Sequence, residues 1–189
     1  FFLFLSLRYF ESTPVTSFDV ATQTLYPIIR SIDEHANIAK DWASKHVNNQ
    51  LAVDESAAIY IYTMEWGETT LYRVLNQALR SEDREALKIW FPYLKLFDTA
   101  LDLLPTVKEV VWRGVPLDLR KQYEIGKTYT WWGFSSCTES IAVLESDQFL
   151  GGEGKRTIFN IECFNGKIIR QHSSFESEDE ILLLPASQF

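Results

Sequence analysis

The sequence predicts an α+β fold, in which a helical N-terminal lobe over residues 1–106 packs on a β-rich lobe over residues 107–189. In the first half, apolar residues recur every three or four positions, as they do on one face of an α-helix. In the second half, short segments rich in β-branched and aromatic residues are separated by turn-forming residues, as in antiparallel strands. With 189 residues, 46% hydrophobic and 14% aromatic, the chain suits a single domain with a substantial core.

The first half contains a series of helical segments with recognisable start and stop signals. Asp54 is a candidate N-cap and Gly67 a candidate stop for the second of them. Pro92 ends one helix and opens another, because proline fits only the first turn of a helix. The expected segments are 31–47, 54–66, 70–80, 81–91 and 92–105.

The second half contains short strand-like segments. They span residues 108–114, 129–136, 155–164, 167–171 and 179–185. Asn165-Gly166 is a dipeptide that type I′ turns prefer. Residues 156–163 and 167–171 are therefore expected to form a β-hairpin.

Composition and charge exclude several classes of function. A net charge of -8 without a basic stripe argues against nucleic-acid binding, which needs clustered Lys and Arg. The three histidines and two cysteines have no metal-ligand spacing, so no metal site is expected. Cys137 and Cys163 are compatible with a disulfide or with two thiols, and the sparse cysteine content favours a reducing compartment. No apolar run reaches the roughly 18 to 20 residues of a membrane span.

Two polar features stand at the ends of expected strands. Arg113 ends an apolar strand and is followed by Gly114, which lets the backbone approach a ligand closely because it has no Cβ. Residues 131–138 form a hydroxyl-rich segment that leaves an aromatic strand. Taken alone, a strand-end arginine is usually solvated or ion-paired, and a Ser/Thr cluster usually serves turn formation.

A third polar feature is the acidic start of the last expected strand. Side chains two positions apart in an extended segment face the same side, so Glu178 and Glu180 are expected to point together and Asp179 to face away. An acidic strand entrance is commonly a solubility device. The order of all three features along the chain is what points to a function.

In that order, the features resemble the mono-ADP-ribosyltransferases of the Arg–Ser–Glu type, the clostridial-toxin-like group that includes the animal arginine-specific transferases. VWRG is similar to the family's arginine strand, GFSSCT to its aromatic-x-Ser-Thr-Ser element and EDEILLLP to its Glu-x-Glu segment. DESAAIYIYT and LYRVLNQALR are also family-like. The resemblance covers roughly residues 10–189 and implies a β-rich ADP-ribosyltransferase core of two facing sheets.

The resemblance implies a role for each matching residue. Arg113 would contact the phosphate and the nicotinamide-side ribose of NAD, because a guanidinium donates in a planar fork. Gly114 would offer backbone groups to the nicotinamide carboxamide, and Ser136 would position the catalytic glutamate. Cys137 and Thr138 stand where the family has Thr and Ser, and the Thr138 hydroxyl retains the ability to form hydrogen bonds.

The remaining implied site residues lie nearer the C-terminus. Phe149 resembles the loop aromatic that packs on nicotinamide, with a plain loop anchor as the alternative. Glu180 matches the catalytic glutamate, whose carboxylate would bind the ribose 2′-hydroxyl and stabilise an oxocarbenium-like ribosyl cation. Glu178 matches the upstream glutamate of the arginine-directed enzymes and would hold the acceptor guanidinium and accept its proton.

The resemblance therefore implies a single catalytic domain over residues 1–189 that transfers ADP-ribose from NAD to an arginine of a target protein and releases nicotinamide. NAD would be a co-substrate, with no metal, and the partners would include the target protein but no nucleic acid. Two alternatives stay open, an NAD glycohydrolase that uses water as the acceptor and an inactive NAD-binding module.

Overall fold

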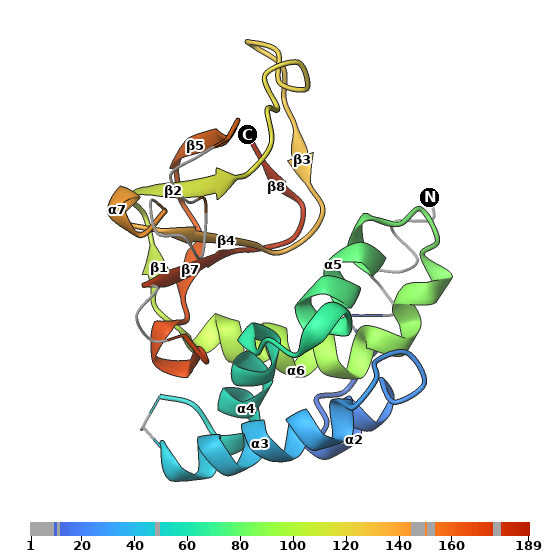
Figure 1. The fold of residues 1–189 in the computed structure, drawn as a ribbon. Helices are drawn as coiled ribbons and strands as arrows, with labels where there is room; N and C mark the ends of the chain where they lie inside the picture. Colours follow the sequence, from blue (N-terminus) through green and yellow to red (C-terminus); the bar gives the residue numbers. More distant parts are fainter. Residues whose placement is uncertain (1–9, 11, 48–49, 145–149, 151–153, 176–178) are drawn as a thin grey trace. The chain divides into compact units, whose positions relative to one another are not determined.

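The computed structural model describes residues 10, 12–47, 50–144, 150, 154–175 and 179–189. The chain divides into two compact units (Figure 1). The helical unit comprises residues 1–104 and 172–175, and the β unit comprises residues 105–171 and 176–189. The predicted α+β class is confirmed, and the change from helices to strands lies beside the expected boundary at residue 106.

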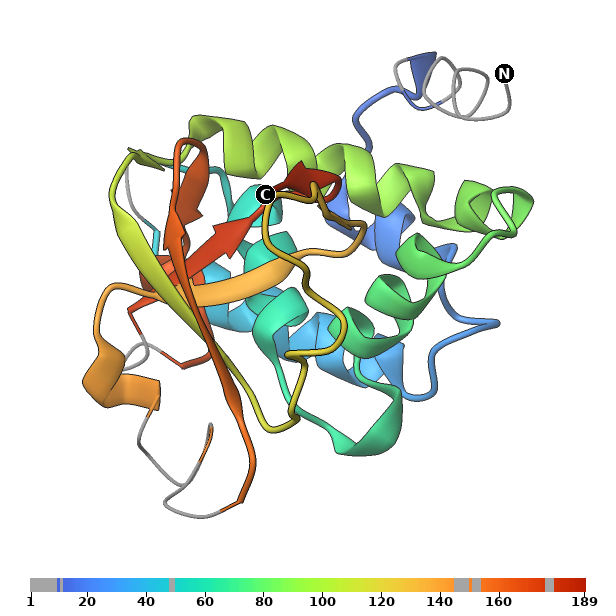
Figure 2. The ribbon, with the colours of Figure 1, turned by 90° about the horizontal axis from the view of Figure 1, so that it is seen from above.

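The helices of the helical unit follow one another along the chain (Figure 2). None of the helices in the described part of the chain is long and apolar enough to cross a membrane. In chain order the helices are α2 (Phe18–Gln23), α3 (Ile32–Lys45), α4 (Val53–Thr63), α5 (Leu71–Arg80) and α6 (Phe91–Leu103), with 3₁₀ turns at Gly67–Thr69 and Glu85–Trp90.

The start of α4 differs from the predicted one. Ala52, not Asp54, is the N-cap residue, and its backbone N–H donates to the Glu55 carboxylate at 2.8 Å. Asp54 lies in the first turn and instead accepts a 3.0 Å hydrogen bond from the backbone N–H of Phe18 in α2. The carboxylate therefore joins two helices, a long-range contact that the local capping pattern could not predict.

The segment 81–91 is also less helical than predicted. Only the 3₁₀ turn Glu85–Trp90 forms within it, and Phe91 already belongs to α6. Asp83 Oδ1 accepts the backbone N–H groups of Glu85 and Ala86 and so caps the turn after residues 81–84. Pro92 lies in the first turn of α6, as predicted from its missing N–H.

Aromatic side chains fill the core of the helical unit. Tyr93 of α6 is fully buried and donates a 2.8 Å hydrogen bond to the carbonyl of Ala58 in α4. The Phe97 ring stacks on Tyr62 of α4, with ring centroids 4.9 Å apart. The two helices are thus joined both by apolar contact and by a satisfied buried hydroxyl.

The segment 172–175 belongs to the helical unit although it comes late in the sequence. His172 is buried, and its Nδ1 lies 2.8 Å from Ser56 Oγ. The backbone N–H of Ser174 donates to Thr63 Oγ1 at 2.8 Å. Both contacts join the segment to α4.

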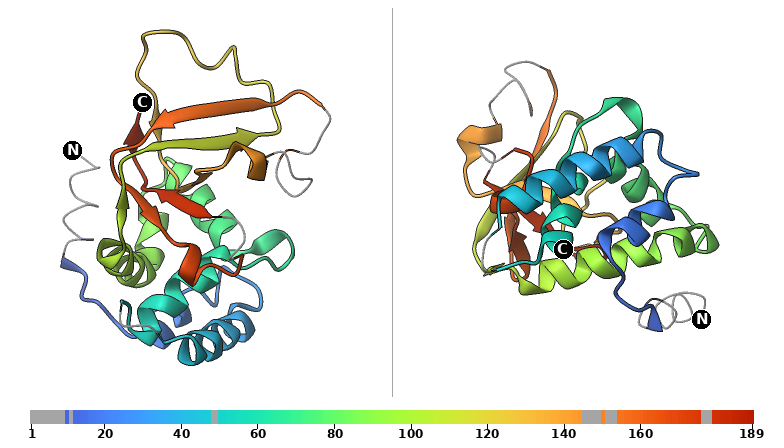
Figure 3. Two further views of the ribbon diagram at one scale, coloured as in Figure 1. Left: turned by 90° about the vertical axis from the view of Figure 1, so that its left-hand side faces the viewer. Right: turned by 90° about the horizontal axis from the view of Figure 1, so that it is seen from below.

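The strands of the β unit form a six-stranded sheet in the order β1-β6-β7-β4-β2-β5 and a smaller sheet of β3 and β8, and every pair is antiparallel. β2 and β5 run side by side as the longest pair (Figure 3). The strands are β1 (Thr106–Val107), β2 (Val110–Val115), β3 (Thr130–Trp131), β4 (Ser135–Thr138), β5 (Thr157–Glu162), β6 (Gly166–Ile168), β7 (Glu180–Leu183) and β8 (Ser187–Gln188), and a short helix, α7 (Ile141–Leu144), follows β4.

The hairpin predicted around Asn165-Gly166 is wrong. β5 pairs with β2, whereas β6 pairs with β1 and β7. Gly166 has no positive φ, and its N–H donates to Cys163 Sγ at 3.1 Å. A Cβ at Gly166 would lie 2.7 Å from Cγ2 of Ile181, so the glycine is needed for close packing rather than for a tight turn.

Candidate active site

Three neighbouring strands of the six-stranded sheet bring together polar residues that are far apart in the sequence. Arg113 lies in β2, Ser136 in β4 and Glu180 at the start of β7, and the sheet order places β4 between the other two strands. The three residues, which are far apart in the sequence, therefore lie on neighbouring strands of the β unit.

Ser136 contacts Glu180 directly. The Ser136 hydroxyl donates a 2.6 Å hydrogen bond to Oε1 of the Glu180 carboxylate. Glu180 is directly opposite Thr138 in the β4–β7 register, and its side chain is 7% exposed. Because side chains alternate along a strand, Ser136, Thr138 and Glu180 share one face of the sheet.

The other face of β4 is structural. Cys137 alternates with Ser136 and joins the apolar core of the β unit with Ile161, Cys163 and Ile181. Cys137 and Cys163 are both buried free thiols. Burial raises the pKa of the Cys137 thiol to about 12, so the thiol stays protonated and does not act as a nucleophile at neutral pH.

Arg113 fixes Ser136 from the side of β2. Its Nη1 donates a 2.6 Å hydrogen bond to the backbone carbonyl of Ser136. The guanidinium carbon also lies 5.7 Å from the centre of the Trp131 ring, a cation–π contact that sequence reasoning did not predict. The Ser136 carbonyl is therefore bound by Arg113, and the Ser136 hydroxyl binds Glu180.

The predicted site residues of β2, β4 and β7 line one small cavity of about 80 Å³. This volume is below the roughly 300 Å³ of a small ligand pocket, so the cavity could accommodate only a fragment of a dinucleotide. Its lining residues are Arg113, Gly114, Ser136, Cys137, Thr138, Leu144 and Glu180.

Gly114 lines this cavity and is closely covered on its side-chain face. A Cβ at this position would lie 2.6 Å from Cδ1 of Leu150, a residue that sequence reasoning did not single out. The missing side chain at Gly114 is filled by the Leu150 side chain in this structure, and the close approach of a ligand to Gly114 stays a prediction.

Glu178 and Phe149, two predicted site residues, lie outside the described residues. The extended segment on which the shared face of Glu178 and Glu180 depended is interrupted, because Asp179 has a φ of 44°. Asp179 forms a 3.1 Å ion pair with Arg170, and β7 begins only at Glu180. The alternation rule therefore does not fix the direction of Glu178.

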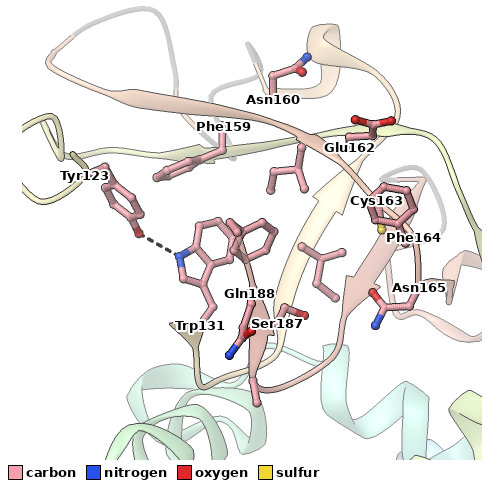
Figure 4. Close-up of a pocket in the computed structure, with 14 residues that line it drawn as sticks. Tyr123, Trp131, Phe159, Asn160, Glu162, Cys163, Phe164, Asn165, Ser187 and Gln188 are labelled. Atoms are coloured by element: carbon pink, nitrogen blue, oxygen red, sulfur yellow. Dashed lines mark hydrogen bonds between the residues drawn. The ribbon is translucent and has the colours of Figure 1, made fainter. Parts of the chain in front are cut away.

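A larger groove of about 750 Å³ lies on the core face of the β unit (Figure 4). Three of its aromatic lining residues, Tyr123, Trp131 and Phe159, lie close together, and none of Arg113, Ser136 and Glu180 lines it. The smaller cavity, not this groove, therefore brings the three predicted site residues together. Among the described residues, no three His, Cys, Asp or Glu side chains gather as a metal site would require.

An antiparallel α+β fold with a buried carboxylate fixed by a serine, beside an arginine on the next strand, fits the class of ADP-ribosyltransferases. The profile of the family described as NAD:arginine ADP-ribosyltransferase matches residues 19–189. The chain belongs to this family, whose members use NAD as the donor of ADP-ribose. A search of curated proteins found no significant match.

Solved structures share the fold. The eucaryotic mono-ADP-ribosyltransferase ART2.2 is similar with a TM-score of 0.70 and 19% identity, over 89% of this chain and 74% of that one. Vis of Vibrio splendidus, solved with agmatine, has a TM-score of 0.57 and 24% identity, over 85% and 78% of the two chains. HopU1 of Pseudomonas syringae has a TM-score of 0.59 and 24% identity, over 83% and 77%.

Proposed function

We propose that residues 1–189 act as one catalytic domain that transfers ADP-ribose from NAD to an arginine side chain of a target protein and releases nicotinamide. The observation that carries the proposal is the 2.6 Å hydrogen bond from Ser136 to the buried Glu180 carboxylate, beside Arg113. The family description names arginine, and Vis was solved with agmatine, a small guanidinium compound. Both support an arginine acceptor.

Arg113 would bind a phosphate of NAD. A guanidinium carries five N–H donors in a planar fork, so its one bond to the Ser136 carbonyl is compatible with a second role toward phosphate oxygens. The Trp131 ring and the carbonyl also hold the guanidinium in a fixed orientation before any ligand binds. Gly114 and Phe149 would contact the nicotinamide end.

Glu180 would stabilise the positive charge that develops on the ribose as the bond to nicotinamide weakens. NAD supplies the ribosyl group and the nicotinamide leaving group. Because Glu180 is 7% exposed and is oriented by Ser136, its carboxylate is largely shielded from water and needs little reorganisation when that charge appears.

Glu178 would act on the acceptor. A guanidinium nitrogen attacks the anomeric carbon of the ribose, nicotinamide departs with the electron pair of the broken bond, and the acceptor's proton passes to Glu178. A protonated guanidinium is a poor nucleophile, so the acceptor needs a carboxylate that removes its proton. Glu178 would perform this step, and Glu180 would stabilise the ribosyl cation.

Isotopically labelled NAD with agmatine tests the proposal directly. ADP-ribosyl-agmatine formed together with nicotinamide is the expected result. Nicotinamide and free ADP-ribose alone, at the same rate with and without agmatine, would instead identify an NAD glycohydrolase. No nicotinamide release from a preparation that binds NAD would identify an inactive NAD-binding module.

A further inference from the structure

Residues 116–129 connect β2 to β3 without any helix or strand of their own (Figures 1 and 3). This segment is called the β2–β3 loop below. Loops of about this length without secondary structure are uncommon in compact domains and are usually functional. The loop begins three residues after Arg113 and returns through β3 to β4, which carries Ser136, so it is joined to the strands of the candidate site.

The start of the β2–β3 loop is fixed to the edge strand β5. Thr157 Oγ1 donates a 2.8 Å hydrogen bond to the carbonyl of Leu117 and accepts a 2.9 Å bond from the N–H of Leu119. One hydroxyl thus satisfies two backbone groups of the loop.

An aromatic cluster fixes the base of the loop. The Tyr123 hydroxyl accepts a 2.9 Å hydrogen bond from Trp131 Nε1, and the centre of its ring lies 5.0 Å from that of Phe159 (Figure 4). The Tyr123 ring centre also lies 4.7 Å from that of Tyr129. The Tyr129 hydroxyl accepts the N–H of Glu124 at 2.7 Å. The β2–β3 loop is therefore ordered before any partner binds, and binding costs little conformational entropy.

The tip of the loop presents an aliphatic side chain to solvent. The N–H of Lys127 donates to the carbonyl of Glu124 at 3.2 Å, and Gly126 has a φ of 81°, the conformation of the third residue of a type II turn. Ile125 occupies the corner of this turn and is 107% exposed. Nothing in the turn geometry requires isoleucine at this corner.

The charges of the loop argue against a membrane or a nucleic acid as the partner. Arg120 forms a two-pronged ion pair with Asp118 at 2.9 and 2.7 Å, and Lys127 pairs with Glu124 at 2.7 Å. Of the loop's cations, all of them described, Lys121 is left without an ion pair. Anionic membranes attract clusters of about four to eight cations, and nucleic acids also need several.

We propose that the β2–β3 loop recognises the acceptor protein. Ile125 enters an apolar depression on that protein, and Lys121 faces an acidic group beside it. The inference rests on the proposed transfer to a protein arginine. A specific protein–protein contact covers about 800 Å² on each partner, so it extends well beyond a cavity that a small guanidinium compound could fill.

The test compares a small acceptor with proteins. Biotin-labelled NAD is given to the enzyme with agmatine or with the proteins of a clarified cell extract. Ile125→Ser is expected to lower protein labelling about tenfold, the effect of exposing one buried aliphatic side chain, and to change agmatine modification less than about twofold. Val47→Ser is the matched control, because Val47 is another exposed aliphatic side chain, at 66%. This control is expected to leave both activities unchanged.

Several outcomes would overturn the proposal. Unchanged protein labelling by Ile125→Ser is one, and an equal loss with agmatine is another. Wild-type binding to phosphatidylserine vesicles that Ile125→Ser abolishes would identify a membrane contact instead. If Ile125→Ser lowers the melting temperature, Lys121→Glu takes its place and is expected to lower protein labelling only.

Failure of the proposed function has a different signature. Wild-type protein that labels extract proteins but not agmatine would overturn the arginine acceptor, while the comparison of variants on proteins would still test the loop. Wild-type protein that labels neither acceptor would overturn both proposals.

Discussion

The Ser136 hydroxyl donates a 2.6 Å hydrogen bond to Oε1 of Glu180, across the neighbouring strands β4 and β7. Arg113, on the other side of β4, binds the carbonyl of the same serine at 2.6 Å. The serine therefore has both its backbone and its side chain constrained. Because the three residues make different contacts, replacing each one is expected to affect a different property of the enzyme.

Glu180→Gln is expected to reduce nicotinamide release about a hundredfold to a thousandfold while NAD still binds, because the amide lacks the charge that stabilises the ribosyl cation. The measurement combines nicotinamide release with NAD titration calorimetry. Asp179→Asn, which alters the adjacent exposed carboxylate paired with Arg170, is the control and is expected to retain activity. Normal nicotinamide release by Glu180→Gln would refute the role of Glu180.

Ser136→Ala is expected to lower kcat roughly tenfold to a hundredfold, the loss that follows from removing one hydrogen bond to a carboxylate. The KM for NAD should change little if Ser136 only positions Glu180. Ser135→Ala is the control, because Ser135 is its neighbour on the opposite face of β4. A rise in KM at constant kcat would instead assign Ser136 to NAD binding.

Glu178→Gln is expected to abolish transfer to agmatine and to retain much of the hydrolysis of NAD, because water needs no carboxylate to hold a guanidinium. The ratio of ADP-ribosyl-agmatine to free ADP-ribose measures the effect. Glu162→Gln changes an exposed carboxylate at the end of β5 and should leave this ratio unchanged. Equal losses of transfer and hydrolysis would contradict separate roles for the two acids.

Arg113→Ala is expected to weaken NAD binding by about tenfold to a hundredfold, because a charge-assisted contact to phosphate is lost together with the support of Ser136. Calorimetry measures the affinity. Arg113→Lys keeps the positive charge but not the planar fork of the guanidinium, so this variant should recover only part of the lost affinity for NAD. Arg120→Ala removes an exposed arginine paired with Asp118 and serves as the control. Unchanged affinity in Arg113→Ala would exclude the contact.

Local patterns predicted those parts of the fold that depend on local physics. The apolar face of α5 follows from a period of 3.6, and Pro92 was placed correctly because its constraint is its own ring. In α3 the same period selected Ile38, which is exposed, whereas Ala36 and Ala43 are buried. Asp54 was misplaced as an N-cap because its carboxylate binds Phe18, which is distant in sequence. The hairpin turn predicted at Asn165-Gly166 was wrong for the same reason, a contact distant in sequence, because Gly166 packs against Ile181.

The sequence named candidate site residues but could not give the contacts between them. Arg113, Ser136 and Glu180 were chosen because their order along the chain resembles that of the family, and all three line one cavity. The bond from Arg113 to the Ser136 carbonyl depends on β4 lying between β2 and β7, an arrangement of strands that no local pattern encodes. Trp131 contacts Arg113 through its ring and Leu150 covers Gly114, and neither contact follows from a local pattern that would distinguish these two residues from other apolar residues.

Burial lowers the pKa of His172 below the value of about 6.5 that an exposed histidine has. Between the two pKa values the unfolded chain binds a proton that the folded protein excludes. The contribution of His172 to stability is therefore fully present above about pH 6.5 and is lost as the pH falls toward the lower, folded pKa. The stability of the wild-type protein should accordingly decrease between about pH 7.5 and about pH 5.5.

His172→Asn is expected to reduce this dependence on pH, because an asparagine amide can occupy the place of Nδ1 beside Ser56 Oγ without titrating. Urea midpoints of both proteins at about pH 7.5 and about pH 5.5 measure the difference. His46→Asn changes an exposed histidine and should behave as the wild type does. If the midpoint of His172→Asn falls as far as that of the wild type, His172 is not the group responsible, and the loss of stability in acid must come from carboxylates that are charged in the folded state.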